Sequence, residues 1–385
     1  MPTVKYNEKK KHYEVRYDSG FDGSGNRKQK FKGGFARKKD ADDYLMEKLN
    51  EIKKGTYISP KKMFLFEYLN SWLELKKDSL SPTTYAGYEL NIRCHINPHI
   101  GGIRLQELRP LHIRKLHSQL KVSRELKIDG EKREFKPLSG TSIRYVHRVL
   151  SKALEDAVSD ETIFKNPAKL VTPPAKEPFE AGFLPVAQIR ELLDKLKGDE
   201  IYIPVFLSVV LGLRRGEVLG LQWEDIDFMS NRIHIRRNYV MVDGKGELLD
   251  QAKTESSHRS IPVTVRMIKE LKAHRHSQKV MRARIKDYHI SDFVCTWPDG
   301  QPFNPSHLSR SLALRLDKLK LPKIRFHDLR HSNAALMIKE RVPAKAASDR
   351  LGHSTIQVHY DLYGHIEKSV QEQIAETIDK AIWGE

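Results

Sequence analysis

The spacing of apolar residues changes along the chain, and near the N-terminus it has the two-residue period of a β-strand. The alternating residues there are His12, Tyr13, Glu14, Val15, Arg16 and Tyr17. Residues 5–20 predict one strand and residues 27–35 a second, and the helical period that follows predicts a helix with Asp40 as its cap and Gly55 just beyond its end. Residues 1–57 are therefore expected to form a small β-sheet with one helix.

Residues 62–165 have the 3.6-residue period of amphipathic helices, which predicts an all-helical bundle. The expected helices cover residues 63–77, 81–96, 109–121 and 141–158. Ser81 and Pro82 suit the cap and the first position of one helix. The charge-rich residues 123–136 are expected to be an exposed loop.

The helix expected over residues 141–158 separates apolar from basic side chains. Its apolar stripe consists of Ile143, Val146, Leu150, Ala153, Leu154 and Ala157. Arg144, His147, Arg148 and Lys152 lie mostly off this stripe. One face is therefore expected to pack, while the other is available to bind phosphates.

The four prolines of residues 166–182 predict a linker that is not helical. After the linker, residues 183–385 mix helical and strand-like patterns. Helices are expected over residues 183–198 and 201–221, a single hairpin sheet over 232–242 and 258–263, and a further strand with its turn over 292–303. Several helices are expected to complete this mixed α/β part, which lacks βαβ alternation.

Charge and composition indicate the kind of partner. The formal net charge of +18 favours a polyanion, with nucleic acid ahead of an anionic membrane surface. Only Cys94 and Cys295 are present, which excludes a disulfide framework and fits a reducing cytoplasm. No signal-peptide core or membrane-spanning apolar run is found, so we expect a soluble protein that stays inside the cell.

Neither a metal site nor a nucleotide site is expected. Cys94, His95 and His99 lie close together in the sequence, but a second pair of ligands is missing. The chain also lacks a GxGxxG or GxxxxGK[ST] motif. The sequence therefore predicts no cofactor.

The first residues carry a local excess of positive charge. Between Lys5 and Lys39 there are 12 lysines and arginines against four carboxylates. A solvated surface is one interpretation, but lysines on one sheet face beside aromatic residues also suit a groove of DNA, which we favour. The candidate DNA-binding residues of the chain are Arg16, Lys28, Lys30, Lys32, Arg144 and Arg148.

Three C-terminal segments carry candidate chemistry. The segment GLRRGEVLGLQWEDID alone is consistent with an amphipathic helix that has a basic turn in its middle. In RFHDLRH, His327 and Arg330 stand three residues apart and could clamp a phosphate from one helix face; the alternative is a helix start with polar surface residues. Gly352 is expected to end a helix, which places His353 at a corner.

Together these segments resemble the tyrosine recombinase, or phage integrase, family, and in particular integrases of temperate phages and conjugative transposons that have an N-terminal arm-binding domain. The segments that carry the resemblance are LGLRRGE, AKTESSHRSIPV, HDLRH, LGH and YGH. By resemblance the catalytic residues are Arg214, Lys253, His327, Arg330, His353 and Tyr363. Asn333 and the pair His359 and Tyr360 depart from the small or aliphatic residues that the family more often has there.

The resemblance implies a multidomain α+β fold. An arm-type DNA-binding domain would cover residues 1–57 and a helical core-binding domain residues 62–165. A linker over residues 166–182 would lead to a mixed α/β catalytic domain over residues 183–385 with a C-terminal helix.

The implied activity is site-specific recombination through a 3′-phosphotyrosine, without a metal or other cofactor. Tyr363 would be the nucleophile, Arg214 and Arg330 would stabilise the charge on the non-bridging oxygens, and Lys253 would be the general acid. His327 or His353 would orient the phosphate and manage the tyrosine proton. Because the phosphotyrosine conserves the energy of the broken bond, a 5′ hydroxyl of another duplex can reverse the step and exchange strands.

The implied partners are double-stranded attachment sites of core and arm type, three further copies in a tetramer on DNA, and host DNA-bending or excisionase-type accessory proteins, all in the cytoplasm of a bacterial host near its nucleoid. An apolar stripe in the tail would pack either on its own domain or on a neighbouring copy. The stripe consists of Ile366, Val370, Ile374, Ile378 and Ile382. Two alternatives remain, a nicking-closing enzyme of the type IB topoisomerase kind and an inactive DNA-binding regulator.

Overall fold

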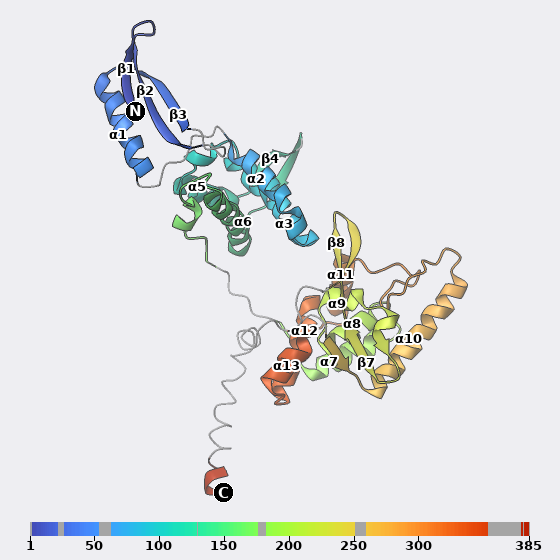
Figure 1. Ribbon diagram of the computed structural model, residues 1–385. Coiled ribbons are helices and arrows are strands. Elements are labelled where there is room, and N and C mark those ends of the chain that lie inside the picture. Colours follow the sequence, from blue (N-terminus) through green and yellow to red (C-terminus); the bar gives the residue numbers. More distant parts are fainter. Residues whose placement is uncertain are drawn as a thin grey trace. The chain divides into compact units, whose positions relative to one another are not determined.

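The computed structural model describes residues 2–21, 27–53, 63–128, 130–175, 182–250, 259–352, 379 and 381–384. The chain divides into two compact units, Met1–Pro178 and Phe179–Glu385 (Figure 1). Among the helices described, none combines the length and the apolar character needed to cross a membrane.

A three-stranded antiparallel sheet and one helix begin the first unit (Figure 1). The elements are β1 (Thr3–Asn7), β2 (His12–Phe21), β3 (Arg27–Phe35) and α1 (Lys38–Lys53). Val15 and Tyr17 are buried with Ala41 of α1, as the alternation predicted. The prediction that Asp40 caps the helix was wrong, because α1 begins earlier and the Asp40 carboxylate instead accepts hydrogen bonds from Arg37.

A helical bundle forms the rest of the first unit. Its helices are α2 (Leu65–Leu75), α3 (Pro82–Asn91), α4 (Asn97–Ile100), α5 (Pro110–Leu120) and α6 (Gly140–Ser159). A π-helical turn, Ile92–Ile96, joins α3 to α4. Ser81 caps α3 and Pro82 is its first residue, as predicted. The predicted apolar stripe of α6 lies in the core of the bundle.

A β-hairpin occupies the segment that was predicted to be a loop. Strand β4 (Arg124–Ile128) pairs with β5 (Glu131–Phe135), and β5 is mostly exposed. Gly130 has a φ of +86°, a conformation that glycine adopts without strain. The Asp129-Gly130 pair between two short alternating runs was the hairpin signal, and the dense charge of the segment obscured it.

Part of the predicted linker is folded onto the bundle. The Asn166 side chain caps a short 3₁₀ helix, Pro167–Leu170, and its amide donates to the Ser151 carbonyl oxygen at 2.9 Å. Ala168 and Val171 are buried in the bundle core. The prolines did not exclude helical structure here, because the first position of a helical turn needs no N–H donor.

The second unit surrounds one apolar core to which helices and strands both contribute. Its helices are α7 (Val186–Leu196), α8 (Tyr202–Leu211), α9 (Arg215–Gly220), α10 (Val265–Arg284), α11 (Pro305–Lys318), α12 (Phe326–Lys339) and α13 (Ala344–Leu351). Its strands are β6 (Ile226–Asp227), β7 (Arg232–Ile235), β8 (Arg237–Val242), β9 (Lys245–Asp250) and β10 (Arg259–Pro262). Figure 1 shows β8 projecting from the side of this unit where α9 lies.

Three predictions for this unit were wrong. Two small antiparallel sheets, β10-β7-β6 and β8-β9, replace the single hairpin, because β7 and β8 pair with different strands. The helix predicted over residues 201–221 is broken at Gly212, whose φ of +68° ends α8. The strand predicted over residues 292–303 is reduced to isolated bridges at Phe293 and Thr296.

Candidate active site and DNA-binding surfaces

Arg214 lies at the N-terminus of α9, just after the turn that ends α8. Its backbone N–H and its Nη1 each donate to the Glu217 carboxylate at 2.9 Å. Its Nη2 donates to the Gly352 carbonyl oxygen at 2.6 Å. These bonds fix the guanidinium, although 40% of the side-chain surface stays exposed.

Arg330 of α12 reaches the same turn from the other side and is 2% exposed. Its Nη1 donates to the Gly212 carbonyl oxygen at 2.8 Å. Gly212 is left-handed, and a Cβ atom there would lie 2.3 Å from Cδ2 of Leu351. Only glycine fits this turn, whose carbonyl oxygen holds Arg330 and which Arg214 follows by two residues.

Asn333, one of the positions that departs from the usual family pattern, ties the end of α8 to α12. Its Nδ2 donates to the Val209 carbonyl oxygen at 2.8 Å and to that of Val210 at 3.2 Å. The last carbonyls of a helix lack partners within the helix. Asn333 therefore supports the turn between the two arginines.

His327 lies in the first turn of α12 with its surface exposed, and its ring meets that of His331 edge to face with centroids 4.9 Å apart. Desolvation by the packed neighbours, together with the nearby His331, Arg330 and Arg325, lowers the pKa of His327 to about 4. The ring is therefore neutral at neutral pH and has one donor and one acceptor.

Glu217 is a buried carboxylate, 1% exposed, for which the sequence alone predicted no role. Arg259 of β10 donates to it from Nη1 at 3.1 Å and from Nη2 at 2.9 Å. Burial opposes ionisation, but the hydrogen bonds and charge of Arg259 and the charge of Arg214 outweigh it and lower the pKa of Glu217 to about 2. The available signal was an acidic residue three positions after Arg214 in an apolar run.

The other predicted catalytic residues, Lys253, His353 and Tyr363, lie outside the described residues. So do Ser354, Tyr360 and the tail stripe up to Ile378. Strand β9 ends before Lys253, and β10 begins after it. Gly352, which caps the C-terminus of α13, immediately precedes His353.

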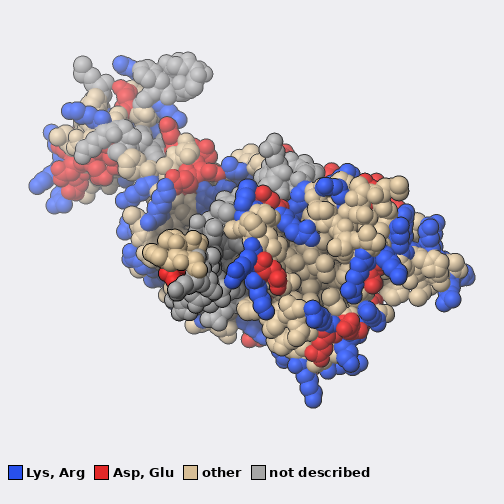
Figure 2. Space-filling model, turned by 90° about the horizontal axis from the view of Figure 1, so that it is seen from below, with Lys and Arg blue, Asp and Glu red and all other residues tan. Residues whose placement is uncertain are grey.

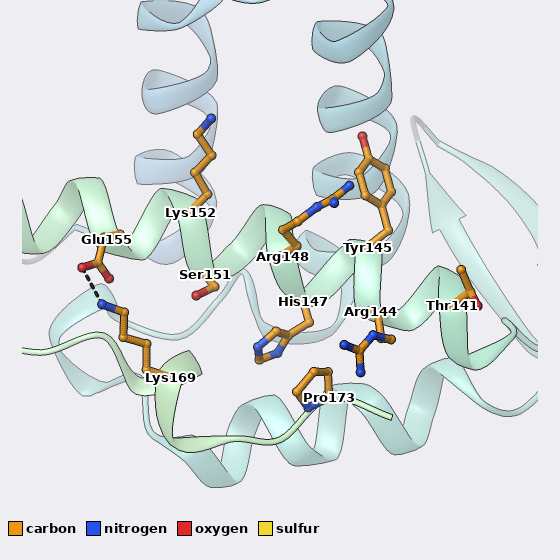
Figure 3. A pocket seen from close by; sticks show the side chains of 10 residues that line it. All are labelled: Thr141, Arg144, Tyr145, His147, Arg148, Ser151, Lys152, Glu155, Lys169 and Pro173. Atoms are coloured by element: carbon orange, nitrogen blue, oxygen red, sulfur yellow. Dashed lines mark hydrogen bonds and ion pairs between the residues drawn. The ribbon is translucent and has the colours of Figure 1, made fainter. Parts of the chain in front are cut away.

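A groove of about 880 Å³ follows α6 and the folded part of the predicted linker (Figure 3). Arg144, Arg148 and Lys152 of α6 line it, and among the described residues no carboxylate forms an ion pair with them. The guanidinium of Arg148 lies 4.9 Å from the centroid of the Tyr145 ring. Exposed cations beside an aromatic ring suit a nucleic-acid backbone.

His147 lines the same groove beside these cations, as predicted (Figure 3), but only 9% of the residue is exposed. Its Nδ1 lies 3.3 Å from Nε2 of His117 on α5. Burial is the main cause that lowers the pKa of both rings, with His147 adding to the effect on His117, whose pKa falls to about 4. The basic face of α6 is therefore made by its arginines and lysine.

The candidate residues of the N-terminal sheet are divided between its faces. Arg16 points away from the buried face on which Tyr17 lies. Lys30 is opposite Tyr17 in the register, so it shares the face that α1 covers. The lysines that alternate onto this face of β3 are Lys28, Lys30 and Lys32. In Figure 2, lysine and arginine side chains are spread over the visible surface rather than confined to one patch.

Three family models match successive parts of the chain. The phage integrase family matches residues 182–369, the phage integrase N-terminal SAM-like domain residues 64–121, and the arm DNA-binding domain residues 2–52. A tyrosine recombinase XerC-like protein of Caldanaerobacter subterraneus subsp. tengcongensis is 27% identical, and the match covers 96% of each chain.

Two solved structures share the fold. The Tn1549 transposon integrase in complex with transposon right end DNA has a TM-score of 0.65 and 20% identity, over 81% of this chain and 100% of that one. A lambda integrase tetramer bound to a Holliday junction has a TM-score of 0.53 and 17% identity, over 92% of this chain and 96% of that one.

Proposed function

Because the chain belongs to the phage integrase family of tyrosine recombinases, we propose that it is an integrase, a site-specific DNA recombinase that cleaves and rejoins DNA through a 3′-phosphotyrosine. The observation that supports this function is that Arg330 donates to the carbonyl oxygen of Gly212, two residues before Arg214, whose own guanidinium is fixed by Glu217 and Gly352. Two fixed guanidinium groups of this kind are what a phosphodiester needs when negative charge develops on its non-bridging oxygens.

In the proposed reaction the Tyr363 oxygen attacks phosphorus, and the bond to the 5′ oxygen breaks. The 5′ oxygen leaves with the electron pair and takes a proton from Lys253, while Arg214 and Arg330 hold the phosphate. A 5′ hydroxyl of a second duplex reverses these steps and releases Tyr363. Neither ATP nor a metal takes part in this scheme.

The sequence-based hypothesis left two roles to His327 or His353, namely orienting the phosphate and managing the tyrosine proton. The pKa of about 4 makes His327 a weak base at neutral pH, but its neutral ring can still donate a hydrogen bond to a phosphate oxygen. We therefore assign orientation of the phosphate to His327 and acceptance of the tyrosine proton to His353.

We propose that both parts of the first unit bind DNA. The exposed cations of the α6 groove, Arg144 and Arg148 among them, would contact backbone phosphates of the core site. The match of residues 2–52 to an arm DNA-binding domain supports arm-site binding by the N-terminal sheet. Arg16 lies on the open face of the sheet and would contact DNA from there. Lys28, Lys30 and Lys32 lie on the other face and would contact DNA from the edge strand β3.

The lambda integrase tetramer on a Holliday junction supports a tetramer as the working assembly. The order of the three family matches supports arm-binding, core-binding and catalytic domains over residues 1–57, 62–165 and 183–385. Host DNA-bending or excisionase-type proteins would assist, in the cytoplasm of a bacterial host close to its nucleoid.

The test uses DNA that flanks the gene in its genome, where an integrase's own attachment site is expected. A denaturing gel should show a covalent protein–DNA adduct that Tyr363→Phe abolishes and Tyr360→Phe preserves. The opposite pattern would identify Tyr360 as the nucleophile, and no adduct in any form would indicate a regulator. Joined products in a two-site assay, as opposed to relaxation of one supercoiled plasmid, separate a recombinase from a topoisomerase.

A further inference from the structure

We propose that Arg259 is a positioning residue of the recombination site: it holds Glu217, and through Glu217 the guanidinium of Arg214, in the geometry that DNA cleavage requires. This inference rests on the proposed function. The side chain of Arg259 is 9% exposed, and its guanidinium donates to the Glu217 carboxylate and to the Arg350 carbonyl oxygen.

The contact between Arg259 and Glu217 is a two-point contact. Nη1 and Nη2 donate to the two oxygens of a carboxylate whose side chain is fully buried. The planar fork of arginine matches a carboxylate in this way, whereas a lysine ammonium is a single point charge. The orientation of Glu217 is therefore set by Arg259, and Glu217 in turn receives the backbone N–H and Nη1 of Arg214.

The same guanidinium also holds the end of α13. Its Nε donates to the Arg350 carbonyl oxygen at 2.9 Å. A Cβ atom on Gly352 would lie 2.9 Å from Nη1 of Arg259, so the glycine leaves room for this side chain. Gly352 is also the residue whose carbonyl oxygen accepts from Arg214.

Arg259 thus joins three segments that each lead to a proposed catalytic residue. Helix α9 begins next to Arg214, β10 follows the segment that contains Lys253, and α13 ends two residues before His353. The three nitrogens of one guanidinium make all of these contacts. A change at this residue is therefore expected to disturb the site as a whole.

The charges around Glu217 make its ionisation depend on Arg259. The charged groups that face the carboxylate are Arg214 on its own helix and Arg259 on β10, while Arg350 of α13 adjoins Arg259. Without Arg259, burial would raise the pKa of Glu217, since only Arg214 would oppose it. A protonated Glu217 would hold Arg214 less firmly, and a rise in pH would restore the ionised form.

The experiment measures the single-turnover rate of adduct formation at saturating DNA for Arg259→Lys and Arg259→Met. We expect a fall of about 10-fold for the lysine variant and about 10²-fold for the methionine variant, since small misplacements of catalytic groups cost about this much. DNA affinity should stay within about 2-fold. The rate relative to the unmodified chain should rise with pH, because Glu217 ionises again.

Two controls separate positioning from folding. Arg315→Lys changes another arginine of the same unit that grips a carboxylate, that of Asp199, at 3.2 and 3.3 Å, and it should leave the cleavage rate unchanged. Glu217→Gln should add little to the loss already caused by Arg259→Met, because residues that act as one unit are not additive.

The inference is overturned if both Arg259 variants cleave like Arg315→Lys once rates are expressed per folded molecule. It is also overturned if their pH profile matches that of the unmodified chain, which is the outcome for a residue that only stabilises the fold. The lysine variant keeps the charge and decides the question if the methionine variant does not fold. Absence of any adduct with the unmodified chain would instead overturn the proposed function.

Discussion

Several histidines lie where the fold opposes their protonation. Desolvation is the main cause that lowers the pKa of His95, of His117 and of His327 to about 4 in each case. Neighbours add to the effect, such as Arg124, whose Nη2 lies 3.0 Å from Nδ1 of His95. These rings are neutral in the folded chain over a pH range in which histidines with an ordinary pKa are charged.

The folded chain is therefore expected to lose stability as the pH falls from about 6.5 to about 4. In this window the unfolded state binds more protons than the folded state, so protonation favours unfolding. His117→Gln should reduce the slope of unfolding free energy against pH by up to about 1.4 kcal/mol per pH unit. Hydrogen exchange of α5 and α6 amides across this range measures the slope, and an unchanged slope would contradict the prediction.

Short turns between elements fix the site more than the elements themselves do. The turn after α8 supplies the Gly212 carbonyl oxygen to Arg330 and leads directly into Arg214. The left-handed Gly352 at the end of α13 does the same for Arg214. Both arginines donate to carbonyl oxygens of left-handed glycines. A residue inside a regular helix would not offer its carbonyl oxygen in this way.

Gly212→Ala is expected to destabilise the second unit and slow DNA cleavage. The new Cβ atom adds a clash with Leu351 to the left-handed strain of about 1–2 kcal/mol. Gly198→Ala is the matched control, because Gly198 has a φ of +83° and no atom within 4 Å of an added Cβ. Chemical unfolding and the adduct rate should separate the two; equal losses would show that the clash with Leu351 is unimportant.

Local sequence patterns predicted the elements whose signals are local. The stripe of α6, the cap of α3 and strand β3 follow from spacing and end residues. The single strand predicted over residues 5–20 is instead two strands, β1 and β2, joined by a turn. The break between α8 and α9 depends on tertiary contacts from Arg330 and Asn333, which no local pattern reveals. The contact between Glu217 and Arg259 spans 42 positions and was missed for the same reason.

At the scale of the whole molecule, most of the net charge of +18 belongs to the first unit, which carries +13 against +5 for the second. In the first unit the α6 groove concentrates exposed cations. In the second, Lys272, Arg275, His276 and Lys279 of α10 line a small hollow beside Phe228. DNA binding is therefore expected to depend strongly on salt.

Removal of the groove cations should weaken core-site binding and flatten its salt dependence. The logarithm of the association constant falls with that of salt concentration by about 0.9 per neutralised phosphate. The triple change of Arg144, Arg148 and Lys152 to alanine should lower that slope by about one unit for each lost contact. Lys115→Ala on α5 is the control, because Lys115 is exposed and does not line the groove; equal effects would sink the groove assignment.

The burial of Arg330 has a consequence for how the sequence is expected to change in evolution once activity is lost. Arg330 is 2% exposed and bonded to the Gly212 carbonyl oxygen, so its loss would cost stability as well as activity. A descendant that stopped recombining but kept its fold would still be under selection to retain it. A relative that retains Arg330 therefore shows that its fold is retained, which is not the same as retained activity. When activity is lost, substitutions are expected first at catalytic positions that make no such structural contact.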